Sequence, residues 1–316
     1  MTLLEPNGPA TTPSTIRTTS SRPASPQVPN GAAAQSESRG RRTLRWVRGH
    51  WGLVLAVAVF ALAIAWAIVP GIFTSYDPIA IDNTARLQPP SADHWFGTDL
   101  LGRDLYARTV YGSRASLLGA SLAVAVAVLV GSVLGAVAGW FGGITDSAAM
   151  RLIDVVLSIP GFLLAITIVV VYSAQTGRTG LVPAALAVGL TSAATFARLI
   201  RAEVLKVRTS NYVEAAVSSG ARSSTILIRH VLPNSVTPTI SLITVQLGIA
   251  IIWIASLSFL GLGQQPPAPE WGLLVADGRK YIATRGWLTL YPALTIVAVV
   301  LSTNHISRHL AKRSAS

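Results

Sequence analysis

The stretch ASLLGASLAVAVAVLVGSVLGAVAGWFGGIT (residues 115–145) contains no Asp, Glu, Lys or Arg. A helix needs about 20 apolar residues to cross the hydrocarbon core of a bilayer, and this stretch exceeds that length. Other segments without a charged residue are near or above the same length, at 49–76, 155–177, 179–197, 230–269 and 286–307. The sequence therefore predicts an all-α polytopic membrane protein with six transmembrane helices.

The overall composition supports this fold class. Of the 316 residues, 51% are hydrophobic and 12% are charged, whereas soluble domains carry about 25% charged residues. The formal charge of +12 is also typical of nucleic-acid-binding proteins. Lys and Arg gather on the cytoplasmic loops of membrane proteins, however, and that topology accounts for the charge. We therefore expect a lipid bilayer as the partner and no nucleic acid.

The basic residues also predict the topology. Arg41, Arg42, Arg45 and Arg48 precede the first apolar segment and place the N-terminus in the cytoplasm. Six spans return the C-terminus to the same side, and residues 198–234 then lie in the cytoplasm. We expect the spans at about 51–73, 116–139, 150–173, 180–199, 235–260 and 288–308.

The regions between the spans differ in character. Residues 1–40 are rich in Pro, Ser, Thr and Ala and predict a disordered cytoplasmic tail. Residues 41–75 form a basic flank and the first transmembrane helix. Residues 76–114 are too polar to span a membrane, and apolar residues at helical spacing over 100–111 predict an amphipathic helix on the extracytoplasmic surface. Residues 115–313 hold the other five helices, and GWFGGITDSAAMR (139–151) predicts a cytoplasmic turn between two of them.

Three glycines in the second span recur at intervals of four residues, at Gly131, Gly135 and Gly139. Removing side chains along one helix face lets two helix backbones approach closely. A flexible hinge is the alternative interpretation, and we favour close packing.

Motifs for chemistry within the chain are absent from the sequence. No Gly-Lys pair occurs, so no phosphate-binding loop of the P-loop type exists, and no Gly-x-Ser-x-Gly elbow occurs either. His305 and His309 have a metal-ligand spacing, but Ile306 stands where a zincin has Glu, so we expect interfacial histidines and no metal site. The centres of the spans hold little beyond Gln246 to bind a coupling ion, which disfavours an ion-coupled carrier. We therefore expect a chain that is not an enzyme and that binds no cofactor.

The segment NYVEAAVSSGARSSTILIRHVLPN (211–234) predicts two short helices separated by a turn. Asn211 can cap the first helix, with Glu214 reaching back as in a capping box. Gly220 suits the left-handed residue that ends a helix. An Ala-Ala surface with few large side chains suits docking into a groove of another protein. An ordinary cytoplasmic loop with well-capped helices remains the alternative from the physics alone.

The same segment resembles the EAA loop of permease subunits in ABC importers. Six residues match that pattern, namely Glu214, Ala215, Ala216, Gly220, Leu232 and Pro233. In that family the loop, here spanning 200–234, is the coupling helix that seats in a cleft of the cytoplasmic ATPase. The resemblance therefore implies that these residues couple the chain to ATP hydrolysis.

Two further stretches resemble the second permease subunit of the dipeptide/oligopeptide/nickel importers. They are HWFGTDLLGRDLYARTVYGSRASLLG (94–119) and SLSFLGLGQQPPAPEWGLLVADGR (256–279). The resemblance implies that they shape the outer mouth of the translocation path, through Gly97, Asp99, Gly102, Arg103, Asp104, Phe259, Gly261, Gly263, Pro267, Trp271 and Gly272. The C-terminal stretch NHISRHLAKR (304–313) departs from the acidic, glycine-rich ending of that family.

The resemblance also implies a fold, partners and a location. We expect a type I ABC importer permease in a bacterial plasma membrane, paired with a homologous second permease, cytoplasmic ATPase subunits that bind ATP and Mg²⁺, and an extracytoplasmic substrate-binding protein. Di- or oligopeptides are the expected cargo, with nickel or a metal chelate as the alternative. An autonomous carrier or channel and a structural scaffold are the alternatives from other classes.

Overall fold

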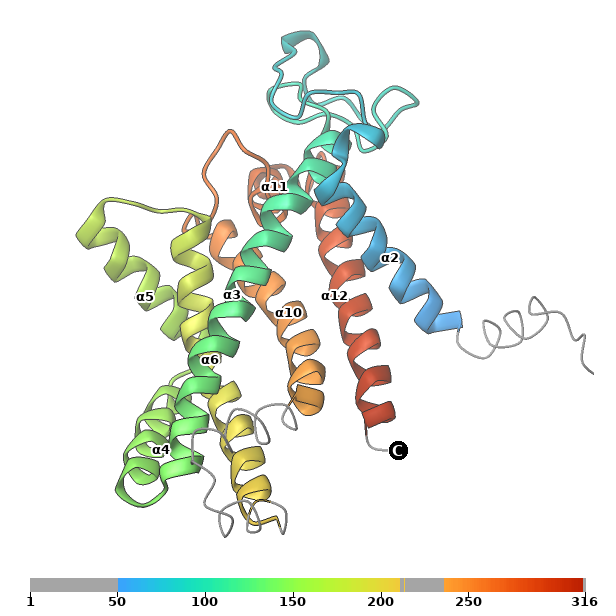
Figure 1. The fold of residues 1–316 in the computed structure, drawn as a ribbon. Coiled ribbons are helices and arrows are strands. Elements are labelled where there is room, and N and C mark those ends of the chain that lie inside the picture. The colour runs from blue at the N-terminus through green and yellow to red at the C-terminus, as the bar shows by residue number, and fades with distance from the viewer. Residues whose placement is uncertain (1–50, 211–212, 214–235, 315–316) are drawn as a thin grey trace, which may run out of the picture. The chain divides into compact units, whose positions relative to one another are not determined.

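The computed structural model describes residues 51–210, 213 and 236–314. Among these residues the structure is helical, with one isolated β-bridge between Thr98 and Asp104. The α-helices are α2 (Trp51–Ile68), α3 (Leu105–Phe141), α4 (Gly143–Ser158), α5 (Gly161–Thr176), α6 (Leu181–Arg208), α10 (Val236–Phe259), α11 (Trp271–Gly278) and α12 (Trp287–Ser314), as Figure 1 shows. Short 3-10 helices lie at Pro70–Ile72, Asn83–Ala85 and Arg279–Tyr281.

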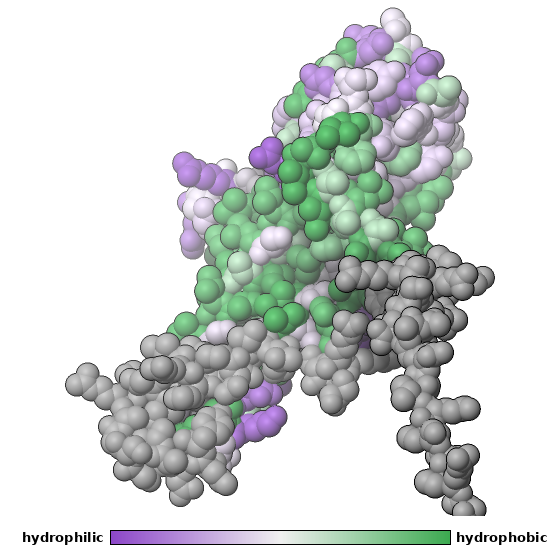
Figure 2. Space-filling view, turned by 45° about the vertical axis from the view of Figure 1, so that its right-hand side comes forward, coloured by the Kyte–Doolittle hydropathy of each residue, from purple (hydrophilic) through white to green (hydrophobic). Residues whose placement is uncertain are grey.

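Five of the described helices, α2, α3, α6, α10 and α12, are long and apolar enough to cross a membrane. The pair α4 and α5 makes a sixth candidate span, but it bends by 92° between its halves. Figure 2 shows apolar side chains gathered in a broad band, with more hydrophilic residues toward the end that carries the 70–104 segment. The prediction of an all-α polytopic protein is confirmed.

The span predicted over 150–173 is broken in the structure, and the turn predicted over 139–151 is confined to the link around Gly142 between α3 and α4. Helix α4 occupies most of that turn, and the chain breaks instead at Ile159 and Pro160. Ile159 is extended (φ −90°, ψ 133°), as expected for a residue that precedes proline. Pro160 has no backbone N–H and cannot continue the hydrogen bonding of α4, so the sequence itself accounts for the break.

The amphipathic surface helix predicted over 100–111 is also wrong. Residues 99–103 form a tight turn, and Asp104 caps a helix that starts at Leu105 and continues for 37 residues to Phe141. Leu105 and Val110 are buried against protein. Their helical spacing therefore marks the packed face at the start of a long span.

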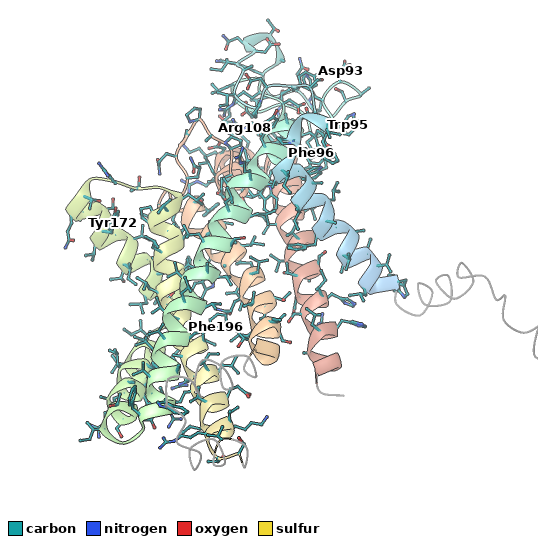
Figure 3. The ribbon with its side chains drawn as sticks, viewed as in Figure 1. Asp93, Trp95, Phe96, Arg108, Tyr172 and Phe196 are labelled. Carbon is teal, nitrogen blue, oxygen red and sulfur yellow. The ribbon has the colours of Figure 1, made fainter. Side chains whose placement is uncertain are left out.

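Helices α3 and α6 pack against each other over much of their length, and the predicted glycines line this contact. A Cβ atom on Gly131 would lie 2.5 Å from both the Ala193 carbonyl oxygen and the Phe196 Cβ. A Cβ on Gly139 would lie 2.9 Å from the Val204 Cβ, and one on Gly135 would overlap the Ala197 carbonyl oxygen. Figure 3 shows Phe196 on α6 where that helix passes α3. The two backbones approach this closely because the side chains between them are absent.

The main core lies where α3, α6 and α10 meet, with further residues from α5, α2 and α12. Its members are mostly small or aliphatic, such as Ala120, Ala184, Ile251 and Ile254. Leucine and valine side chains on other faces of the helices point outward, including Leu118, Leu129 and Val133 of α3. Outward apolar faces of this kind suit a hydrocarbon surrounding.

Candidate functional site

The first of the two family-like stretches folds into a turn built around Asp99. One carboxylate oxygen of Asp99 accepts hydrogen bonds from the backbone N–H of Leu101 (2.8 Å) and Arg103 (3.0 Å). The other oxygen accepts from Arg103 Nε at 2.7 Å. Gly102 closes the turn at φ +74°, where a Cβ would overlap the Asp82 carbonyl. The turn therefore requires the Asp, the Gly and the Arg at these positions.

A second carboxylate starts α3. Asp104 Oδ1 accepts from the Ala107 N–H at 2.6 Å, which satisfies one of the free donors in the first turn of the helix. Asp104 Oδ2 lies 2.8 Å from His94 Nδ1. Gly97, at φ +75°, leaves no room for a side chain, because a Cβ would lie 2.6 Å from the Gln88 carbonyl oxygen. The stretch from His94 to Asp104 is thereby fixed onto the helix that follows.

Arg108 joins this turn to the second family-like stretch. Its side chain is 1% exposed and lies at the N-terminal end of α3 (Figure 3). Its Nε is 3.5 Å from Asp99 Oδ2, its Nη2 is 3.7 Å from Asp277 Oδ2, and its Nη1 donates to the Pro78 carbonyl at 3.3 Å. We call Asp99, Arg103, Arg108 and Asp277 the charge cluster. Burial raises the pKa of the Asp277 carboxyl, and the nearby Arg108 and Arg103 guanidinium groups lower it in part.

The charge cluster is too tightly packed to hold a transported solute. The cavity between Asp99, Arg103, Asp277 and their neighbours measures about 20 Å³, which is near the minimum for a single water molecule. The cluster therefore serves as a connection between α3 and α11.

Glu270 and Trp271 anchor the second stretch more deeply. The Glu270 carboxyl is fully buried; it caps α11 by accepting from the Leu273 N–H at 3.0 Å, and it accepts from the Ser116 hydroxyl on α3 at 2.9 Å. The buried Trp271 donates from Nε1 to the Thr109 carbonyl at 2.9 Å. Burial raises the pKa of the Glu270 carboxyl, and hydrogen bonds from the Gly272 and Leu273 N–H groups and the Ser116 hydroxyl partly offset this.

The remaining predicted residues of this stretch let the chain fold back on α10. Phe259 ends α10, and the Arg279 guanidinium lies 5.5 Å from its ring centroid. Gly261 has φ +82°, and Pro267 follows a cis peptide bond. Side chains on Gly263 and Gly272 would overlap Ser258 and Ala255 of α10. The structure thus brings the two predicted outer-mouth stretches together at one end of α3 and α10.

An apolar cavity of about 410 Å³ opens beside this end. It is lined from α5, α10, α11 and α12, and its walls include Phe162, Phe259, Gly272 and Ile296. Two predicted outer-mouth residues, Phe259 and Gly272, thus contribute to its wall.

At the other end of the bundle, α6 leads toward the predicted coupling loop. The predicted coupling residues Glu214, Ala215, Ala216, Gly220, Leu232 and Pro233 lie outside the described residues. Val213 is described: its N–H donates to the Ser210 carbonyl at 3.0 Å, and its side chain packs in a small core with Ala136, Val204 and Trp140. Val213, the residue before Glu214, is therefore packed against α3 and α6.

Two arginine–carboxylate pairs join α6 to α4 near this end. Arg201 donates from Nε and Nη2 to the two carboxylate oxygens of Asp146, with an Nη2–Oδ2 distance of 2.5 Å. Arg198 pairs with Asp154. The partners are 55 and 44 positions apart in the sequence, so no local pattern predicts either pair.

Arg108, Glu270 and Asp277 are the functional candidates that sequence reasoning missed. All three lie inside the two family-like stretches, yet nothing in their spacing shows that Arg108 and Asp277 meet across 169 positions of the chain. For Glu270 the sequence did hold a signal: a lone Glu directly before a Trp-Gly pair, the position of an N-cap before a helix.

Comparison with known proteins agrees with this arrangement. Residues 131–316 match the family described as binding-protein-dependent transport system inner membrane component. The chain is 35% identical over 295 residues to the dipeptide transport system permease protein DppC of Alkalihalophilus pseudofirmus, covering 92% of this chain and 95% of that one. It is 37% identical over 270 residues to the probable D,D-dipeptide transport system permease protein DdpC of Escherichia coli K12, covering 85% and 89%.

A third relative is the glutathione transport system permease protein GsiD of Pectobacterium atrosepticum, 38% identical over 261 residues and covering 82% and 85% of the two chains. Among solved structures, an inward-facing MetNI methionine ABC transporter chain superposes with a TM-score of 0.51 at 18% identity. The match covers 64% of this chain and 96% of that one, and it supports the fold alone. The chain belongs to the family of inner membrane components of binding-protein-dependent transport systems, the multi-pass permease subunits of ABC transporters.

Proposed function

We propose that this chain is a permease subunit of an ATP-driven importer for di- and oligopeptides. The observation that carries the proposal is the set of relatives: three permeases named for a dipeptide, a D,D-dipeptide and glutathione match over 82% or more of this chain at 35–38% identity. Each of these cargoes is a short peptide or peptide derivative. The two stretches that resemble peptide-importer permeases also meet in one place in the structure.

In this proposal the chain forms half of the translocation path beside a homologous second permease and performs no catalysis itself. Cytoplasmic ATPase subunits bind ATP and Mg²⁺ and dock on the 214–220 segment. Their closure is passed to the membrane helices, which exchange inward-open and outward-open states. The arginines before the first span support a cytoplasmic N-terminus and, with six spans, a cytoplasmic C-terminus.

The proposal also gives a role to the opposite end. With the N-terminus in the cytoplasm, the charge cluster and the Glu270–Trp271 anchor face outward, where an extracytoplasmic binding protein delivers cargo. A mouth that receives a protein has to keep its shape, and the buried hydrogen bonds of Asp99 and Glu270 support a rigid one.

Reconstitution tests this proposal. The chain is purified with its neighbouring permease, ATPases and binding protein, and the complex in proteoliposomes is given ATP with either a radiolabelled dipeptide or ⁶³Ni²⁺. We expect ATP-dependent dipeptide uptake that requires the binding protein. Nickel uptake without peptide uptake would overturn the cargo assignment. Recovery of the chain alone from a mild detergent, with ATP-independent transport, would overturn the importer assignment.

A further inference from the structure

Helices α4 and α6 make contact through a small apolar core, in which Ile153 packs with Ala194 and Ala197, and through two arginine–carboxylate pairs. Arg201 donates two parallel hydrogen bonds to the Asp146 carboxylate, a geometry that fixes the relative orientation of the two side chains as well as their distance. The side chains of this pair are 30% and 19% exposed, whereas Arg198 and Asp154 of the second pair are 52% and 60% exposed. The Arg201–Asp146 pair is therefore the better shielded of the two and the stronger tie.

The same part of α6 is continuous with the segment that leads to the coupling loop. From Arg201 the helix runs without a break to Arg208, and the chain then packs through Val213 against α3. The glycine contacts with α3 end in the same region, where Gly139 meets Val204. A displacement applied beyond Val213 thus acts on α6 within a few turns of the Arg201–Asp146 pair.

Helix α4 leads from this pair to the break at Ile159 and Pro160, beyond which α5 turns away by 92°. Among its described residues α5 buries Ala165 and Val169, which pack in the main core with residues of α6, and the rest of its side chains are partly or fully exposed. Its first turn rests on Trp253 of α10: the Phe162 and Trp253 rings lie 6.0 Å apart, and a Cβ on Gly161 would lie 2.6 Å from Trp253. Figure 3 shows Tyr172 near the far end of α5.

We propose that the Arg201–Asp146 pair is a positioning pair that makes α4 move with α6, so that motion at the coupling loop reaches the Ile159–Pro160 break and turns α5. Arg201 and Asp146 touch neither cargo nor nucleotide in this scheme. They convert displacement of α6 into movement of α4 and rotation of α5. In this scheme α5 turns while its first turn stays in contact with Trp253 of α10. The inference rests on the proposed importer function.

A purely structural role predicts something different. If the pair only neutralises two charges near the membrane, removing both charges would leave transport intact. If the pair is a mechanical tie, a neutral pair that lacks the tie would uncouple ATP hydrolysis from uptake, and an exchanged pair would restore it. The two readings therefore diverge in the ratio of cargo transported to ATP hydrolysed.

The test uses the full reconstituted complex with Asp146→Arg, Arg201→Asp, the exchange D146R/R201D and the neutral double variant D146N/R201Q. We expect both single variants and the neutral double variant to lower dipeptide uptake per ATP hydrolysed by at least about fivefold, the lower end of typical coupling effects. We expect the exchange to restore the ratio to within about twofold of wild type. Arg151→Glu is the matched control, because it reverses a charge on an exposed residue of α4 that makes no ion pair among the described residues.

Separate readouts distinguish failure of this inference from failure of the proposed function. Absence of peptide uptake by the wild-type complex would mean that the proposed function is wrong. Wild-type uptake with an unchanged coupling ratio in D146N/R201Q would mean that the positioning role is wrong. Co-purification of the ATPases with every variant is expected, because residues 214–220 are unaltered, and a variant that loses them would contradict a role in transmission alone.

A distance measurement between α5 and α3 tests the motion of α5 directly, independently of transport activity. The chain has no cysteine, so Val170→Cys on α5 and Leu129→Cys on α3, both outward-facing residues, give the only two spin-labelling sites in this chain, which is labelled before the complex is assembled. We expect the distance between the labels to change when ATP and vanadate are added to the otherwise unaltered complex. We expect no change in the D146N/R201Q background. An equal change in both backgrounds would overturn the proposal.

Discussion

The Ser116 hydroxyl donates a hydrogen bond to the Glu270 carboxyl at 2.9 Å, across 154 positions of the chain. The Ser116 oxygen also accepts the Trp271 N–H at 3.1 Å, so one small side chain of α3 satisfies two polar groups at the start of α11. Small neighbours make this approach possible, since Gly112 lies one turn earlier with the Glu270 backbone 3.4 Å from its absent Cβ. The α11 segment is thereby attached to α3 by buried hydrogen bonds.

Removal of the Glu270 carboxyl should destabilise the protein through loss of the cap and of a partner for Ser116. We expect Glu270→Ala to lower the free energy of unfolding by about 1–3 kcal/mol. Glu270→Gln should cost less, because its oxygen can accept from Leu273 while its amide donates to the Ser116 oxygen. Equilibrium unfolding in mixed dodecyl maltoside and SDS micelles measures both, with the exposed Asp93→Asn as control. Equal losses for the alanine and glutamine variants would contradict the hydrogen-bond account.

The buried Glu270 carboxyl should also give stability a characteristic pH dependence. Its pKa is raised in the folded protein by burial, so between the unfolded and folded pKa values the folded state binds more protons than the unfolded state. Stability is therefore greatest in acid and falls as the pH rises through the folded pKa. We expect the unfolding midpoint of the wild type to decline over this range more steeply than that of Glu270→Gln. Parallel pH profiles would show that Glu270 does not titrate there.

Arg108 is a buried guanidinium that lies between the buried Asp99 carboxylate and the partly exposed Asp277 carboxylate. We expect Arg108→Met to cost about 3–5 kcal/mol of stability, as for other buried pairs that lose one partner. Adding Asp277→Asn should recover part of the loss, because it removes the carboxylate that Arg108 faces at 3.7 Å. A double-mutant cycle should give an interaction free energy of about 0.5–3 kcal/mol. Simple additivity would contradict direct coupling between Arg108 and Asp277.

The α3–α6 contact should be intolerant of even one added methyl group. A Cβ on Gly131 would lie 2.5 Å from two atoms of α6, so we expect Gly131→Ala to cost about 1–3 kcal/mol of stability. Gly71→Ala is the control, since no atom lies within 4 Å of its added Cβ. Thermal unfolding followed by tryptophan fluorescence compares the two. Equal unfolding midpoints for the two variants would mean that α3 and α6 accommodate the added methyl group without loss of stability.

The predicted coupling segment is tested by a substitution outside the described residues. We expect Gly220→Val to abolish peptide uptake while the protein still inserts, because a branched side chain disfavours the left-handed conformation expected there. Ala216→Asp should instead prevent the ATPases from co-purifying, because it places a charge on the expected docking surface. Membrane fractionation, uptake assays and affinity purification separate these outcomes. Normal peptide uptake in both variants would contradict the assignment of this segment to ATPase coupling.

The helices could be predicted from the sequence because each apolar segment is long and the charges between segments are clear. The break at Pro160 was missed because residues 155–177 lack charges throughout, and that count ignores what proline does to the helix ladder. The 100–111 helix was misplaced because Leu105 and Val110 have the same spacing whether they face lipid or protein. Apolar periodicity identifies a helix face without saying what covers it.

The site was predictable only as far as its local turns. Gly102 and Asp104 act within a few residues, and their roles follow from turn and cap chemistry. Arg108 and Asp277, in contrast, meet through tertiary packing, and so do Arg201 and Asp146. No local rule connects such pairs, so their roles appear only when the helices are placed side by side.

Helix α3 has 37 residues and therefore a length of about 56 Å, while the hydrocarbon core of a bilayer is about 30 Å thick. Even with tilt, several of its turns extend beyond the lipid tails. The turns that carry Arg108 and Ser116 belong to its N-terminal end, so the buried charges need never be dissolved in hydrocarbon. In the proposed importer, the N-terminal turns of α3 therefore support a water-facing segment, and that segment can change to suit a different binding protein without any change in the membrane-spanning turns.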